Sequence, residues 1–145
     1  MKSEPEAFSI DDLKHLKRDA WSGVRNYLAR NYMKEMRVGD LMLFHHSSVN
    51  PAGVVGIGKI VAAAHPDETQ FDKKSPYFDP KATKAKPIWY CVDVGFAEKF
   101  PRMLTLDELR GVKALKDMVL LERGSRLSVQ PVTDKEFAAI VRLAK

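Results

Sequence analysis

The stretch that decides the fold is residues 41–64, which read LMLFHHSSVNPAGVVGIGKIVAAA. Residues 41–46 form an apolar run that ends in two histidines, and residues 54–64 form a second run rich in Val, Ile and Ala. Apolar runs of this kind, bounded by turn residues, are typical of strands. Asn50-Pro51 lies between the two runs and indicates a loop. The glycines at 56 and 58 indicate a bend or the close approach of another backbone.

Further strands are expected towards the C-terminus. Residues 88–96 alternate, with Ile88, Tyr90, Val92 and Val94 on one side, and this period of two predicts a third strand. Shorter apolar runs predict two strands around a turn at Gly124, over 118–121 and 127–132.

Capping residues and helical spacing mark the helices. Ser9 can accept a hydrogen bond from an orphan backbone donor of the helix that follows it. Thr105 with Glu108, and Thr133 with Glu136, have the spacing of capping boxes. Val24, Leu28 and Tyr32 are spaced to share one helical face. These signals predict helices over 10–17, 24–35, 105–111 and 133–144.

The order of elements favours one fold class. Residues 66–87 form a long polar segment, and loops of this length are usually functional or disordered. The aromatic residues of this segment, among them Tyr77, argue against simple disorder. The predicted strands do not alternate regularly with helices, which favours an α+β domain, a barrel-like β-sheet decorated by short helices, over a doubly wound sheet. A chain of 145 residues is expected to form a single domain over 1–145.

Positive charge is concentrated in one window. The chain has 24 basic and 19 acidic residues, a net charge of +5, and residues 14–37 contain seven basic against two acidic residues. A local positive excess suits a polyanion such as nucleic acid and predicts that this window contacts phosphates, while a solvated helix surface is an equally open interpretation. The apolar stretches are too short to span a bilayer and no signal peptide is visible, so we expect a cytoplasmic protein with no membrane partner.

Signatures of common enzyme classes are missing. The sequence has no phosphate-loop, nucleophile-elbow or His-Glu-x-x-His motif. His45 and His46 are adjacent on a predicted strand and point to opposite faces, so they do not chelate one metal; a catalytic base, a base-reading donor and an exposed imidazole all stay open. Cys91, the single cysteine, excludes an internal disulfide and a Cys-rich zinc site, and a buried inert thiol is favoured over a nucleophile.

Four short motifs supply stacking faces and hydrogen-bonding groups. They are Lys2-Ser-Glu-Pro5, Trp21-Ser-Gly-Val-Arg-Asn26, Tyr77-Phe-Asp-Pro80 and Ser125-Arg-Leu-Ser-Val129. Aromatic faces together with amide, hydroxyl and carboxylate groups are what holds an extruded base by stacking and by its Watson–Crick edge.

Taken in order, these and neighbouring motifs resemble the EVE domain family over essentially the whole chain. The resemblance extends over Lys2-Ser3-Glu4-Pro5, Trp21-Ser-Gly-Val-Arg-Asn-Tyr27, Ala29-Arg30-Asn31, Gly39-Asp40, Phe44-His-His-Ser47, Thr69-Gln-Phe-Asp72, Tyr77-Phe-Asp-Pro80 and Arg126-Leu-Ser-Val-Gln-Pro-Val132. It implies a PUA-like fold related to YTH and ASCH domains. It also implies binding of DNA or RNA that carries a modified base, methylated or hydroxymethylated cytosine above all, without a cofactor or metal. The chain departs from the usual family residues at Ser22, Leu28 and His45, and it begins at Met1, where the family has a short strand before Lys2.

The resemblance implies a pocket for the base. Trp21 would form a wall against which the base stacks, and Asn26 and Ser47 would read its edge. Lys2, Ser3 and Glu4 would close the floor or contact the exocyclic group, and Arg25 would face a phosphate. The further candidates are His46, Tyr77, Asp79 and Ser128.

Three functions follow as hypotheses. The first is a non-catalytic reader of a modified base flipped into the pocket. The second is a small hydrolase acting on a modified nucleoside, with Lys2 and Glu4 or a histidine as acid–base groups. The third is a protein-interaction domain whose basic window is a solvated face.

Overall fold

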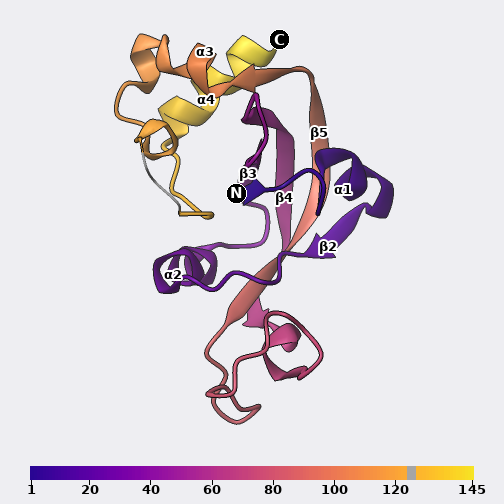
Figure 1. Cartoon of the computed structure of the whole chain (residues 1–145). Coiled ribbons are helices and arrows are strands. Elements are labelled where there is room, and N and C mark those ends of the chain that lie inside the picture. The colour runs from indigo at the N-terminus through magenta and orange to yellow at the C-terminus, as the bar shows by residue number, and fades with distance from the viewer. Residues whose placement is uncertain (124–126) are drawn as a thin grey trace.

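The computed structural model describes residues 1–123 and 127–145, and within them it contains a mixed five-stranded sheet with four α-helices around it (Figure 1). The strands are β1 (Lys2–Ser3), β2 (Arg18–Ala20), β3 (Leu41–His46), β4 (Gly53–Pro66) and β5 (Tyr90–Thr105). The helices are α1 (Ile10–Leu16), α2 (Tyr27–Glu35), α3 (Leu106–Arg110) and α4 (Asp134–Ala144). Short 3₁₀ turns cover Glu68–Phe71, Lys113–Leu115 and Val119–Leu121.

The sheet is strongly curved. Its order is β1-β3-β4-β5-β2, with β1 parallel to β3 and every other neighbouring pair antiparallel. The β4–β5 ladder shifts register at four points, and such bulges bend a strand and increase its twist. The close approach of another backbone that the glycines predict is confirmed at Gly56, where a Cβ would collide with the backbone carbonyl oxygen of Glu98. These bends give the barrel-like α+β fold that the sequence predicts.

Two apolar clusters pack on the two faces of β3. Phe44 belongs to a cluster with residues of α1 and α2, whereas its neighbour Leu43 belongs to a cluster with residues of α3 and α4. Successive strand residues point to opposite faces of the sheet, so β3 contributes side chains to both clusters. Figure 1 shows α3 and α4 together at one end of the molecule and the long loop between β4 and β5 at the other.

The predicted helices and the three main strands are confirmed, with shifts of up to three residues at most ends. The exception is β5, which continues to Thr105, well past the end predicted at residue 96. The helix expected over 24–35 begins at Tyr27, because the Asn26 side chain accepts a hydrogen bond from Ala29 N and caps the helix there. β1 and β2 were not predicted. They have two and three residues and form only through pairing with distant partners, β3 and β5.

Two predicted strands are wrong. Residues 118–121 form a 3₁₀ turn over Val119–Leu121, and residues 127–132 are irregular. Met118 and Val129 are buried, so the apolar residues of these segments pack in the core without pairing in the sheet. A short apolar run does not by itself specify a strand. The turn expected at Gly124 lies outside the described residues, as do Ser125 and Arg126 of the fourth motif. Among the described helices, none is long and apolar enough to cross a membrane.

Candidate functional site

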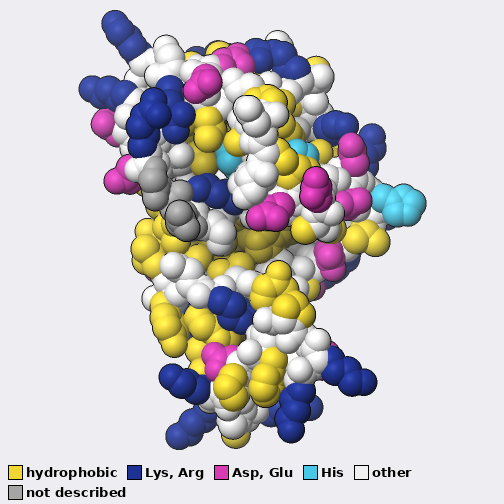
Figure 2. All heavy atoms as spheres, in the orientation of Figure 1, with side chains coloured by type: hydrophobic (Ala, Val, Ile, Leu, Met, Phe, Trp, Pro, Cys, Tyr) yellow, Lys and Arg dark blue, Asp and Glu magenta, His cyan; other side chains and the backbone are white. Residues whose placement is uncertain are grey.

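An open cavity of about 870 Å³ lies where the two edges of the sheet approach each other. Residues of β1 and β2, the outermost strands of the sheet, both line it, as does the end of β3. Figure 2 shows the corresponding hollow across the middle of the molecule. The predicted site residues that the fold brings together here are Lys2, Ser3, Glu4, Trp21, Arg25, Ser47, Tyr77 and Ser128.

Three predicted site residues do not line the cavity. The Asn26 side chain caps α2, and its Oδ1 atom accepts from Ala29 N at 2.9 Å. His46 Nε2 accepts from Ile10 N at 3.1 Å and so holds the start of α1. Asp79 Oδ2 accepts from the indole Nε1 of Trp89 at 2.8 Å. In the structure these side chains position backbone and neighbouring side chains instead of facing the cavity.

Trp21 belongs both to the core and to the cavity wall. Only 9% of it is exposed, and its ring packs edge-on against Phe44 and Phe8 with centroid distances of 5.4 and 6.3 Å. Its backbone N–H donates to Val92 O at 2.8 Å. The indole is therefore a rigid wall whose orientation is fixed from behind by two aromatic rings.

The Tyr77 ring packs directly on the backbone of Gly23. Gly23 has φ +85°, and a Cβ there would lie 2.8 Å from Cζ of Tyr77. Glycine is required here for two reasons: the backbone is left-handed, and any side chain would collide with the Tyr77 ring. Tyr77 is 44% exposed, so a large part of its ring remains available at the cavity.

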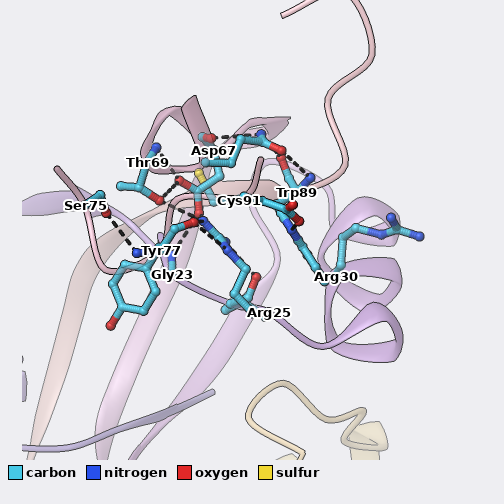
Figure 3. Close-up of polar contacts among 12 residues, drawn as sticks. Gly23, Arg25, Arg30, Asp67, Thr69, Ser75, Tyr77, Trp89 and Cys91 are labelled. Carbon is cyan, nitrogen blue, oxygen red and sulfur yellow. Dashed lines mark hydrogen bonds and ion pairs between the residues drawn. The ribbon is translucent and has the colours of Figure 1, made fainter. Parts of the chain in front are cut away.

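Asp67 holds this wall together, and sequence reasoning missed it. It is 1% exposed and accepts hydrogen bonds from Gly23 N at 2.8 Å, Thr69 N at 2.9 Å and Arg25 Nη1 at 3.2 Å (Figure 3). Burial alone would raise the pKa of this carboxyl, but the hydrogen bonds from Thr69, Gly23 and Arg25 outweigh burial and hold the pKa below its usual range. The one signal in the sequence is the spacing of Asp67 and Thr69, which suits an aspartate that caps a short turn.

Arg25 is directed at protein groups rather than outward. Its Nη2 atom donates to Tyr77 O at 2.7 Å and to Thr69 Oγ1 at 3.0 Å, in addition to the ion pair with Asp67. The guanidinium also lies 5.3 Å from the Trp89 ring. Arg25 thus ties the segment after Trp21 to the long loop, and its predicted contact with a phosphate gains no support from this geometry.

His45 is the histidine that lines the cavity. It is 4% exposed, and neither ring nitrogen has a hydrogen-bond partner among the described residues. Burial, with nearby positive charges as a smaller cause, lowers the pKa of His45 to about 3. The imidazole is therefore neutral at physiological pH and offers one donor and one acceptor. The candidate named from the sequence was His46, whereas the histidine that lines the cavity is His45, because which of the two does so depends on the face of β3 that meets the cavity.

Cys91 has a histidine partner across the sheet, but its thiol is not activated. Its Sγ atom lies 3.9 Å from His65 Nδ1, and His65 Nε2 lies 2.8 Å from Asp93 Oδ1. Burial, together with the charges of Asp67 and Asp93, raises the pKa of the thiol to about 12. Only the thiolate is nucleophilic. The Cys91 thiol stays protonated and only 2% of the residue is exposed, which suits a structural role. Within the described part of the chain, no group of three His, Cys, Asp or Glu side chains could hold a metal ion.

We expect Cys91 to resist alkylation. At pH 8 the folded protein should react with iodoacetamide at least about a hundredfold more slowly than the chain unfolded in guanidinium, because its thiolate fraction is about a thousandfold below that of a free cysteine. Mass spectrometry of timed samples measures both rates. Rapid labelling of the folded protein would show an accessible, activated thiol and would favour an enzyme.

Comparison with known proteins decides the family. The model of the EVE domain matches residues 1–143. The chain belongs to the EVE domain family. This EVE domain is 42% identical over 162 residues to thymocyte nuclear protein 1 of Homo sapiens, a match that covers 99% of this chain and 72% of that protein. It is 44% identical to thymocyte nuclear protein 1 of Danio rerio, covering 99% of this chain and 70% of that protein.

Solved structures share the whole fold of this EVE domain. A protein of Pseudomonas syringae superposes with a TM-score of 0.96 at 48% identity, covering 100% of this chain and 97% of that one. The human THYN1 protein in complex with DNA containing 5-methylcytosine superposes with a TM-score of 0.94 at 40% identity, covering 100% and 95%. These neighbours confirm the α+β, PUA-like architecture.

Proposed function

We propose that this EVE domain binds DNA that contains a modified base, methylated or hydroxymethylated cytosine above all, and holds that base, rotated out of the duplex, in the cavity of about 870 Å³. The observation that supports this most strongly is the shared fold with human THYN1, whose structure is a complex with DNA containing 5-methylcytosine. The match covers the whole of this chain, so every segment that lines the cavity has a counterpart there.

The cavity has the groups that such a base requires. Trp21 and Tyr77 supply aromatic surfaces, and stacking of a base on an aromatic side chain contributes about 1–3 kcal/mol. Extruding a base costs a few kcal/mol, so stacking has to be supplemented by hydrogen bonds to the base edge. The hydroxyls of Ser47 and Ser128 and the unpartnered imidazole of His45 lie in the same cavity.

A second candidate function is hydrolysis of a modified nucleoside. Lys2 and Glu4 both line the cavity, and burial lowers the pKa of the Lys2 ammonium, as expected for an amine used in acid–base chemistry. We place this below the binding function, because the human THYN1 structure, which shares the fold, is a complex with DNA containing 5-methylcytosine.

Fluorescence anisotropy with matched duplexes tests the proposal. The duplexes carry one 5-methylcytosine, one 5-hydroxymethylcytosine or cytosine at the same position, and a 2-aminopurine beside it reports unstacking. We expect tighter binding of a modified duplex and a rise in 2-aminopurine fluorescence on binding. Equal affinity for all three duplexes would contradict the proposal. In a separate assay, modified nucleosides are incubated with the protein and separated by chromatography. Release of the free base would support hydrolysis.

A further inference from the structure

A second concentration of positive charge lies in the loop between β4 and β5. Residues 73–86 contain five lysines and one aspartate, Asp79. Outside residues 14–37 the chain has as many acidic as basic residues, so this concentration does not appear in the net charge. The lysines of this loop are Lys73, Lys74, Lys81, Lys84 and Lys86.

These ammonium groups are available to a ligand. All five lysines are exposed, and in the described part of the chain none of them forms an ion pair. The Asp79 carboxylate is engaged by Trp89 Nε1 and by the backbone N–H of Lys81. Glu68 and Asp72, just before the loop, are exposed and reduce the local excess without cancelling it.

Three basic residues of the 14–37 window are differently placed. Arg18 pairs with Asp93 at 3.1 Å, and Arg25 pairs with the buried Asp67. The Arg30 guanidinium donates to Ile88 O and lies 4.9 Å from the centroid of the Tyr27 ring. Arg18, Arg25 and Arg30 thus have partners within the protein. Lys14, Lys17, Lys34 and Arg37 are exposed, as the loop lysines are, so the loop adds a second positive surface that faces solvent.

The loop is fixed relative to the cavity. Tyr77, in its middle, lines the cavity, and its carbonyl oxygen accepts from Arg25. Asp79 N donates to Gln70 O at 3.0 Å, and the buried Gln70 side chain donates to Trp89 O at 2.7 Å. These bonds join the residues on both sides of the loop to its middle. Figure 3 shows the contact between Arg25 and Tyr77. Tyr77 is thus the point at which the loop meets the cavity, and the loop lysines precede and follow it in the chain.

We propose that the loop of residues 73–86 binds the phosphate backbone of the nucleic acid whose base occupies the cavity; this inference rests on the proposed function. Duplex DNA has one negative charge per about 1.7 Å of helix axis, so a strand that delivers a base past Tyr77 brings phosphates close to Lys81, Lys84 and Lys86. Lysine contacts to phosphates position the ligand without reading its sequence. The loop supplies affinity, and the cavity supplies the preference for a modified base.

Two variants with equal net charge test the inference. One replaces the loop lysines, Lys81→Gln, Lys84→Gln and Lys86→Gln. The matched control replaces three exposed lysines, Lys113→Gln, Lys116→Gln and Lys145→Gln. They belong to the segments that follow α3 and α4, at the opposite end of the molecule from the loop (Figure 1). Affinity for the methylated and unmethylated duplexes is measured between 50 and 300 mM KCl, about the range in which counterion release is read, and thermal unfolding confirms that both variants are folded.

The loop variant should lose at least about tenfold in affinity for both duplexes at about 100 mM salt, and its slope of log K against log salt should be about 2–3 shallower, since each phosphate contact contributes about 0.9. The control should change far less, and the ratio between the duplexes should stay the same in both variants. A loop variant that matches the control overturns the inference but leaves the proposed function intact if the wild type still prefers the methylated duplex. If the loop variant has a shallower salt slope but the wild type does not prefer the methylated duplex, the contact between the loop and phosphates is supported and the base-reading function is overturned.

Discussion

Replacing Trp21 by alanine should lower the free energy of unfolding by about 3–5 kcal/mol, because the change removes a buried aromatic side chain and leaves a cavity. The indole is 9% exposed and packs against Phe44 and Phe8. Thermal unfolding will show this loss as a large fall in the melting temperature. Binding by this variant therefore has to be measured well below its melting temperature.

Trp21→Phe separates stacking from stability. A phenyl ring keeps much of the packing against Phe44 and presents a smaller face to the cavity, so we expect part of the preference for a methylated duplex to remain. Anisotropy with methylated and unmethylated duplexes gives the ratio directly. If Trp21→Phe is stable and keeps the full preference, while Tyr77→Ala abolishes it, then Tyr77 and not Trp21 is the stacking wall.

Replacing Asp67 by alanine is the second change with a large expected effect. It removes the ion-pair partner of Arg25 and leaves the half-buried N–H groups of Gly23 and Thr69 without their acceptor. Removing one partner of a buried ion pair costs about 3–5 kcal/mol. Because Arg25 and Gly23 position Tyr77, binding of the methylated duplex should weaken as well. Urea unfolding and anisotropy measure the two effects.

The Asp67 carboxylate also predicts a dependence of stability on pH. Its pKa is lowered in the folded protein, so its contribution to stability is complete above the unfolded pKa of about 3.9 and is lost as the pH falls through the folded value. Asp67→Asn should therefore be less stable than wild type at pH 7, with a difference that narrows towards pH 2. A constant difference across this range would show that the hydrogen bonds, and not the charge, account for the effect.

The sequence determined the elements whose signals are local. Capping residues such as Ser9 and Thr133 satisfy backbone donors within three positions, so they mark helix starts wherever the rest of the chain goes. The period of two in residues 88–96 and the apolar runs of residues 41–64 likewise specify strands from neighbouring residues alone. The ordered motifs identified the family, and with it the fold, before any contact was known.

Only the tertiary structure decided which side chains meet. β1 and β2 exist because distant strands pair with them, and the cavity exists because a curved sheet brings these two edges together. Asn26 and His46 have suitable chemical groups, but their side chains hold the starts of α2 and α1. His45 lines the cavity and the buried Asp67 supports its wall, although the sequence analysis proposed neither of them for the pocket. A hydrogen bond across 44 residues, as between Asp67 and Gly23, depends on the path of the whole chain, and no short stretch of sequence encodes it.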